Sequence, residues 1–392
     1  MSNFIALDLW LNGIATFIAL LTIPGTLELL LLTLGGILPS RRLAGQSHPL
    51  HHLAIVVPAH NEELDIARCV THLLACDKPT DRFSVHVVAD NCTDNTAQEA
   101  KHAGATVWVR NDLQNIGKGH ALDFVFTELL KQDVDAVLIV DADTIVEKNF
   151  VQACEQVFNT GADAVQCRYT VNNPDAAIRT RFMHISLMAF NVLRPRGRQF
   201  WGLSVGISGN GFGLTRHTLE KVPYTARSVV EDLEYHITLV KAGLKVQFVD
   251  ATTVRADMPT GQKASDTQRA RWEGGRFRMM REYIPSLLKQ VLMGHGRLVE
   301  ILLELLLLPL ALHVLLLLIL LVFPVTQVYA LFGLGLVTVH ILAGIWIGNG
   351  QWKDVLILAT APIYILKKLL LLPKLLKAAR KDTTWVRTDR EK

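Results

Sequence analysis

Val137-Leu138-Ile139-Val140-Asp141-Ala142-Asp143-Thr144 is the stretch that decides the fold. Four apolar residues run directly into two acids one residue apart. A continuous apolar run of this length is typical of a strand buried on both faces. Ligands of an open α/β sheet collect outside the carboxyl ends of its strands, where two carboxylates suit Mg²⁺ or Mn²⁺ carrying a diphosphate. An acidic turn is the alternative, since Asp is common in turns.

Short apolar runs alternate with amphipathic stretches on both sides of this strand. The alternation predicts a mostly parallel, doubly wound α/β sheet. Strands are expected over Leu53–Val57, Ser84–Ala89, Thr106–Val109, Ala136–Val140, Ala164–Tyr169 and Val246–Val249. Helices are expected over Glu62–Leu74, Asn95–Ala103, Lys118–Leu130, Glu147–Phe158, Asp175–Leu193, Val229–Val240 and Thr267–Met280.

Composition indicates a membrane component. Of the 392 residues, 50% are hydrophobic and only 19% are charged. The net charge of +4 is too small to argue for a nucleic-acid partner. The five cysteines form an odd set without a Cys-x-x-Cys pair, which argues against a disulfide framework or a zinc site and fits a reducing compartment.

The N-terminal region, residues 1–44, is expected to form one transmembrane helix. Leu9–Leu38 is almost uncharged, is long enough for a single crossing and is kinked at Pro24-Gly25. A signal peptide is the alternative, but no basic residue precedes the run and the run is too long for an h-region. Because Arg41 and Arg42 follow directly, the positive-inside rule places the N-terminus outside and the next region in the cytoplasm.

The C-terminal part returns to membrane-like sequence after a cytoplasmic domain at 45–275 and a connector at 276–297. Leu298–Val322 and Val325–Ile347 are each long enough to cross, which gives two transmembrane helices over 298–348. Val355–Leu366 is too short to span. The last region, 349–392, is therefore expected to lie in the interface, because a third crossing would place its basic residues outside. Those residues are Lys367, Lys368, Lys374, Lys377, Arg380 and Lys381.

Polar residues also follow the first two expected strands. Pro58, Asn61 and Glu62 leave the first strand, and Asp90 leaves the second. A carboxylate at Asp90 could accept a hydrogen bond from the imide of a uracil, so a nucleotide base could lie between these strands. Lys118, in a glycine-containing turn before a helix, could meet phosphate together with backbone N–H groups. With the two acids of the central stretch, these residues describe a nucleotide-diphosphate site.

Two motifs in the second half point to a reaction. Glu231 and Asp232 open an expected helix, where acids can also be simple dipole partners. Gln268, Arg271 and Trp272 are spaced i, i+3 and i+4 and share one helix face. An amide, a guanidinium and an indole on one face can grip a diphosphate and pack a sugar. A surface arginine face with one buried tryptophan is the alternative.

A basic segment and a glycine-rich loop follow the Asp175–Leu193 stretch. The segment holds Arg194, Arg196 and Arg198, which fit either a solvated loop or a surface near anionic lipid or a diphosphate. The loop runs from Gly202 to Gly213.

The ordered motifs resemble those of the family 2 inverting glycosyltransferases. The resemblance is closest to the membrane-embedded branch, which holds cellulose, chitin, hyaluronan and poly-N-acetylglucosamine synthases and ceramide glucosyltransferases. It covers about Leu53 to Gly275, and the flanking membrane segments agree in position. The motifs are Pro58-x-x-Asn61-Glu62, Asp90, Asp141-x-Asp143, Glu231-Asp232 and Gln268-x-x-Arg271-Trp272.

The resemblance implies a GT-A domain and a UDP-sugar donor. Asp90 would contact the uracil, Asp141 would lie against the ribose or sugar, and Asp143 would hold Mg²⁺ or Mn²⁺ on the diphosphate. Asp232 would be the general base that takes the proton from the acceptor hydroxyl, and a single displacement would invert the anomeric centre. The other implied donor-binding residues are Pro58, Asn61, Glu62, Lys118, Gln268, Arg271 and Trp272.

The resemblance also places an acceptor loop at Ser208-Gly209-Asn210-Gly211, with Glu231 and Trp272 on the acceptor side. It implies a growing glycan or a lipid as acceptor, membrane lipids as surroundings, an export or assembly partner and a location in the cell (inner or plasma) membrane. This sequence departs from the family pattern in two ways. Val230 precedes the acceptor-side acids where the family often has Thr. The chain also has fewer expected membrane helices than the large processive synthases, which argues against processive synthesis and a self-contained export channel.

Two other functions compete with this one. An apolar strand followed by Asp141-x-Asp143-x-Thr matches the first motif of haloacid-dehalogenase-type phosphatases, with Asp141 as nucleophile. That family places the motif near the start of its domain, whereas two strand–helix units precede it here. The third hypothesis is a non-catalytic membrane scaffold subunit, against which the presence of every expected acid speaks.

Overall fold

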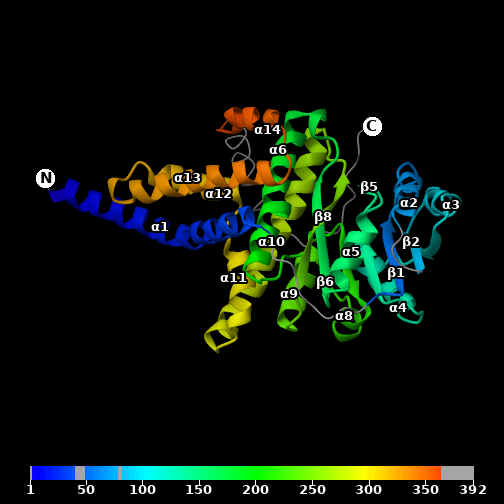
Figure 1. The fold of residues 1–392 in the computed structure, drawn as a ribbon. Helices are drawn as coiled ribbons and strands as arrows, with labels where there is room; N and C mark the ends of the chain where they lie inside the picture. Colours follow the sequence, from blue (N-terminus) through cyan, green and yellow to red (C-terminus); the bar gives the residue numbers. More distant parts are fainter. Residues whose placement is uncertain (1, 40–48, 78–81, 363–392) are drawn as a thin grey trace.

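An eight-stranded sheet forms the centre of the computed structural model, which describes residues 2–39, 49–77 and 82–362 (Figure 1). The strand order is β3-β2-β1-β4-β7-β6-β8-β5. The strands are β1 His52–Ala59, β2 Arg82–Asp90, β3 Thr106–Arg110, β4 Ala136–Ile139, β5 Thr144–Val146, β6 Ala164–Val171, β7 Phe212–Thr215 and β8 Val246–Ala256.

The sheet confirms the α/β prediction but is mixed. Strands β3, β2, β1 and β4 run parallel to one another, and so do β6 and β8. Strand β7 is inserted antiparallel between β4 and β6, and β5 pairs antiparallel with β8. The sequence did not predict β7 or β5, because strands of three or four residues show no periodicity and their partners are distant in the chain.

Helices cover both faces of the sheet, as the apolar runs predict. Leu53, Ile55 and Val57 of β1 pack into one apolar cluster, and the alternate residues Ala54 and Val56 pack into the other. This alternation explains why the strand is apolar throughout. The covering helices are α2 Ile66–Leu74, α3 Thr96–His102, α4 Lys118–Leu129, α5 Phe150–Phe158, α8 Arg216–Lys221 and α9 Glu231–Lys241.

The basic segment after Leu193 is helical and largely buried, so the expectation of a solvated loop is wrong. The chain runs through α6 (Ile178–Met188), a π-helical turn at Ala189–Leu193 and α7 (Arg194–Phe200) without a loop. Arg194 and Arg198 are only 8% and 6% exposed. Buried charges need partners, and Arg198 finds them in carboxylates from other helices, at 3.1 Å from Glu28 and 3.0 Å from Glu304.

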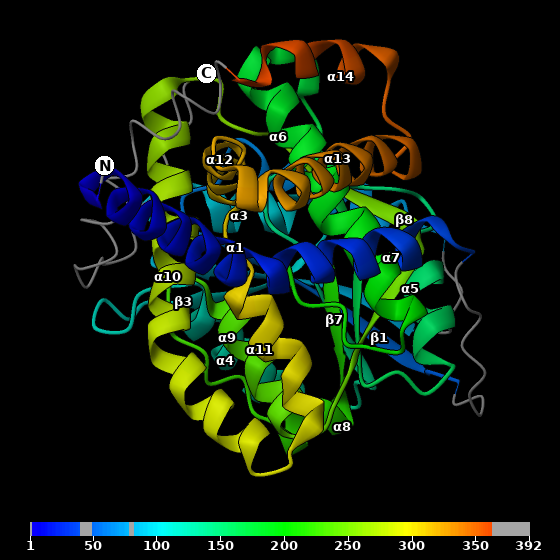
Figure 2. The same cartoon turned by 90° about the vertical axis from the view of Figure 1, so that its left-hand side faces the viewer.

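Among the described residues, two single helices are long and apolar enough to cross a membrane, and the bent helix pair at 296–320 would be a third if it forms one span. The two single helices are residues Asp8–Ile37 of α1 (Ser2–Ile37) and the whole of α13 (Pro324–Ile347). Figure 2 shows α1, α12 and α13 side by side, where their apolar side chains form one cluster. The basic pair Arg41-Arg42 lies outside the described residues.

The helix expected over Leu298–Val322 is broken into α11 (Val299–Leu306) and α12 (Leu310–Leu320), bent by 75°. Pro309 explains the break, since proline lacks the N–H for the helical ladder and keeps the preceding residue from helical geometry. Helix α11 packs against α9 and α10 in a cluster of its own. Helix α12 lies with both α1 and α13, and α11 also contacts α1.

Helix α10 (Gln262–Leu292) runs without interruption across the expected boundary between residues 275 and 276. Near the end of the described chain, α14 (Trp352–Ile357) is tied to α6 by an ion pair of 2.7 Å between Asp354 and Arg181. The six basic residues expected at the membrane interface lie outside the described residues.

Candidate active site

A cavity of about 1350 Å³ lies at the carboxyl ends of β1, β2 and β4. Its walls come from stretches that are far apart in the chain. The predicted site residues that line it are Pro58, Glu62, Asp90, Lys118, Asp141, Asp143, Ser208, Gly209, Glu231, Asp232, Gln268, Arg271 and Trp272. Asn61 and Asn210 do not line it.

The end of β4 carries Asp141 and Asp143 as the apolar run predicts. The Asp141 carboxylate accepts a hydrogen bond from the Lys118 ammonium at 2.5 Å, and the same ammonium donates to the Gly209 carbonyl at 2.5 Å. Burial by itself would lower the pKa of Lys118, but Asp141 and Glu231 outweigh it and raise that pKa. Lys118 is therefore a permanent cation that joins three parts of the cavity wall.

Asp143 lines the same cavity as Asp141, and one of its oxygens lies 3.5 Å from the Thr144 hydroxyl. Within the described ranges no three His, Cys, Asp or Glu side chains gather into a closed metal site. This donor set suits Mg²⁺ or Mn²⁺, because such ions are commonly held by one or two carboxylates with substrate phosphates and water completing the shell.

Asp90 closes the end of β2 and is held by Arg110 of β3. The two form an ion pair of 2.6 Å with side chains only 8% and 9% exposed. Removal of one partner from such a buried pair costs roughly 3–5 kcal/mol, because the other charge is left without compensation. An Asp90 variant would therefore lose stability as well as any contact with a base.

The side chains of Asn61 and Asn210 accept hydrogen bonds from backbone N–H groups near the cavity. Asn61 has a φ of 56°, a left-handed conformation that Asn tolerates, and its side-chain oxygen accepts from the Thr93 N–H at 2.8 Å. Asn210 is 1% exposed, accepts from the Asp141 N–H at 3.1 Å and donates to the Thr144 hydroxyl at 2.8 Å. Asn210 thus fixes the turn that carries both aspartates.

Glu231 and Asp232 form an acidic pair on the floor of the cavity, at the first turn of α9. Burial and the neighbouring Asp232 carboxylate raise the pKa of Glu231 to about 7, against the opposing effect of Lys118. Burial also raises the pKa of Asp232. The pair is thereby suited to accepting a proton near neutral pH.

The rate of a reaction that uses Glu231 as a base should rise with pH through about 7, and one that uses Asp232 should rise at a pH above the range of an ordinary aspartate. Only the carboxylate form accepts a proton, and the raised pKa values keep part of the pair protonated below that pH. The measurement is kcat/KM against pH. Glu231→Gln removes a neighbouring negative charge, so the rise should move to lower pH. An unchanged profile in that variant would contradict the electrostatic coupling.

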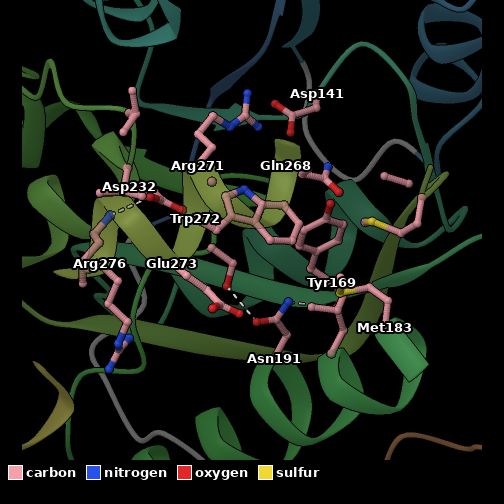
Figure 3. Close-up of a pocket in the computed structure, with 18 of the residues that line it drawn as sticks. Asp141, Tyr169, Met183, Asn191, Asp232, Gln268, Arg271, Trp272, Glu273 and Arg276 are labelled. Atoms are coloured by element: carbon pink, nitrogen blue, oxygen red, sulfur yellow. Dashed lines mark hydrogen bonds between the residues drawn. The ribbon is translucent and has the colours of Figure 1, made fainter. Parts of the chain in front are cut away.

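Helix α10 presents one face to the cavity, as the i, i+3, i+4 spacing predicts. Gln268, Arg271 and Trp272 all line it, and Figure 3 shows Arg271 reaching toward the side where Asp141 lies. Trp272 packs against the apolar cluster that also holds Tyr169. This packing holds the Trp272 ring in place as part of the cavity lining.

Gly209 lies where a side chain would meet the acidic pair. Its φ is 75°, and an added Cβ would stand 3.0 Å from an Asp232 carboxylate oxygen. Gly209→Ala should lower kcat at least about tenfold by displacing that carboxylate. Gly161→Ala is the matched control, because Gly161 has a similar φ of 84° with nothing within 4 Å of its added Cβ. Equal losses in both variants would assign the effect to backbone strain alone.

Sequence reasoning missed several cavity residues. They are His60, Tyr169, Met183, Phe190, Asn191, Arg227, Glu273 and Arg276. Asn191 lies on the π-helical turn, where its oxygen accepts from the Ser208 hydroxyl at 3.3 Å. π-helical turns are often found at functional sites, but nothing in the local sequence predicts one here.

The family model described as "Glycosyltransferase like family 2" matches residues 49–275, which is more than half of the chain. A probable glycosyltransferase from Bacillus subtilis, YdaM, is 27% identical over 61% of this chain and 59% of its own length. The beta-monoglucosyldiacylglycerol synthase of Synechocystis is 28% identical over 60% of this chain and 50% of its own length. The matched region thus spans little more than half of these relatives.

Among solved structures, the chain is similar to the mannosyltransferase PcManGT from Pyrobaculum calidifontis, determined with GDP-Man and Mn²⁺. The likeness covers 94% of this chain and 96% of that one, with a TM-score of 0.57 and 16% sequence identity. It shows that the two proteins share the GT-A fold.

Proposed function

Since the chain belongs to glycosyltransferase family 2, we propose that it is a membrane-anchored inverting enzyme that transfers a sugar from a UDP-sugar. The observation that carries this proposal is the single cavity that joins Asp143, Asp232 and the Trp272 face of α10. The family membership also removes the phosphatase alternative, because residues 49–275 include Asp141.

The donor end of the cavity is the end of the sheet. Asp90 would accept a hydrogen bond from the uracil imide; its lining of the cavity and its ion pair with Arg110 support this role. Asp143 would hold Mg²⁺ or Mn²⁺, which would neutralise charge on the leaving diphosphate. Arg271 lines the same cavity as a further cation for the diphosphate. Lys118 would hold the Asp141 carboxylate in place beside the ribose or sugar of the donor.

The acceptor end is the floor at α9. Asp232 is the general base that removes the proton from the acceptor hydroxyl, and its burial raises its pKa. The hydroxyl oxygen then attacks the anomeric carbon directly, and the diphosphate leaves from the opposite side. One displacement of this kind inverts the configuration and needs no covalent intermediate.

Anchoring rests on α1 and α13, which we propose cross the membrane with the sheet domain on the cytoplasmic side. Nucleotide sugars are then available to the cavity. The relatives include a lipid-modifying synthase, which supports a membrane location.

Full-length protein in lipid nanodiscs, incubated with Mn²⁺ or Mg²⁺ and a panel of labelled UDP- and GDP-sugars, tests the proposal. One UDP-sugar should be turned over with inversion, as read from the anomeric coupling of the product by NMR. Retention of configuration would refute the single displacement. Exclusive use of a GDP-sugar would refute the role of Asp90 in selecting uracil.

A further inference from the structure

We propose that the acceptor is a membrane lipid with a free hydroxyl in its headgroup, which reaches the base through an apolar arm of the cavity. This acceptor class rests on the proposed function. It goes further by naming what the transferred sugar is attached to and which helices bind it.

The cavity does not end at the acidic pair. Its lining also holds Arg276 and apolar side chains of helices that lie with α1. These side chains are Leu308, Leu310, Ala311 and Val314 of the α11–α12 break and α12, and Ile341 of α13. The candidate active site is thus continuous with the apolar helices that are suited to a bilayer.

The break between α11 and α12 creates this arm. A straight helix over Leu298–Val322 would continue its apolar surface in one direction, whereas the 75° bend turns α12 toward α1 and α13. Breaking a helix frees carbonyl groups, and Arg276 satisfies two of them by donating to the carbonyls of Glu304 and Leu307. The arm is therefore a stabilised feature of the fold.

Two guanidinium groups, those of Arg194 and Arg276, line the cavity together with these apolar side chains. Arg194 lines the cavity with its guanidinium 5.0 Å from the centre of the Phe190 ring, and it is 8% exposed. In the described part of the chain, no carboxylate lies within ion-pair distance of Arg194 or Arg276. Guanidinium groups only donate, so they can bind ester, ether or hydroxyl oxygens of a headgroup placed at this level.

The base identifies the nucleophile as a hydroxyl. A phosphate monoester is already ionised near neutral pH, with a second pKa of about 6, so it needs no base to attack. A hydroxyl does need one, and Glu231 and Asp232 line the same cavity as the apolar side chains. A soluble glycan fits the arm poorly, because its hydroxyl groups would lose water against Ala311, Val314 and Ile341 without gaining partners.

Nanodiscs of phosphatidylcholine allow three acceptor probes to be compared with one labelled donor. The probes are dioleoylglycerol, dioleoyl phosphatidic acid and a soluble oligosaccharide. Label should pass into the organic phase with dioleoylglycerol. Transfer to the oligosaccharide or to phosphatidic acid instead, or no lipid product from protein that binds donor, would overturn the lipid-hydroxyl assignment. Absence of donor binding would overturn the proposed function itself.

Two variants test the arm directly. Ala311→Trp and Val314→Trp fill it and should lower transfer to dioleoylglycerol at least about tenfold, with donor binding unchanged. Leu318→Trp is the matched control on the same helix, because Leu318 is 46% exposed and does not line the cavity. Transfer to dihexanoylglycerol, with its short chains, should fall less. Equal losses for both lipids, or the same loss in the control, would overturn the arm as the chain-binding site.

Discussion

Asp232→Asn should lower turnover roughly 10²–10⁴-fold, the usual contribution of a general base, while the affinity for the nucleotide sugar stays nearly unchanged. The amide keeps the size of the side chain but cannot accept the proton of the acceptor hydroxyl. Its oxygen can still accept the hydrogen bond that the Leu233 N–H makes to Asp232 at 2.8 Å. The first turn of α9 should therefore stay folded.

The measurement pairs single-turnover kinetics with calorimetric titration of UDP. Glu220→Gln is the control for the loss of one carboxylate, because Glu220 lies on the surface in an exposed pair with Arg216, and such pairs contribute little. Glu231→Gln distinguishes the role of Glu231 from that of Asp232. This variant should shift the pH profile and keep most of the turnover at high pH. Full turnover in Asp232→Asn with a large loss in Glu231→Gln would move the base to Glu231.

Removal of divalent metal should abolish transfer, and Asp143→Asn should make the enzyme require much more metal for the same rate. The diphosphate leaves with negative charge, and a metal ion would add its positive charge to that of the cations that line the cavity, Arg271 among them. Lys118 is already committed to Asp141 at 2.5 Å. We therefore expect a metal on Asp143 to supply charge stabilisation at the leaving diphosphate.

The experiment is activity against free Mn²⁺ or Mg²⁺ after treatment with EDTA. Asp133→Asn is the matched control, since Asp133 is an exposed acid that precedes the opposite end of β4. It should leave the metal dependence unchanged. Undiminished transfer in EDTA, or an Asp143→Asn variant with the same half-saturating metal concentration as the parent, would remove the metal role from Asp143.

The residue pattern was sufficient for those parts of the site that depend on a single element. The run from Val137 to Asp143 predicts a doubly buried strand with two acids at its end, because burial on both faces demands apolar side chains at every position. The spacing of Gln268, Arg271 and Trp272 predicts a shared face, because helix geometry alone sets it. All five of these polar and aromatic side chains line the cavity.

Other features required the folded chain. Asn210 was expected in an acceptor loop, yet it is buried and holds the Asp141 N–H. A glycine-rich loop does not reveal which of its side chains point inward. The segment with Arg194 and Arg198 was expected to be exposed, but it is helical and packs against α1. Arg198 can be buried because Glu28 and Glu304 converge on it from other helices, and local sequence does not record that convergence.

By itself, the sequence determined the family, the α/β class, the strand-end acids and the apolar helices, because periodicity and short motifs act over a few residues. Only the tertiary structure decided that the sheet is mixed, that α11 and α12 bend by 75° and that the cavity runs from Asp141 to Val314. These features depend on contacts between residues far apart in the chain. The energy of such contacts comes from packing and desolvation in the folded protein, which no local pattern encodes.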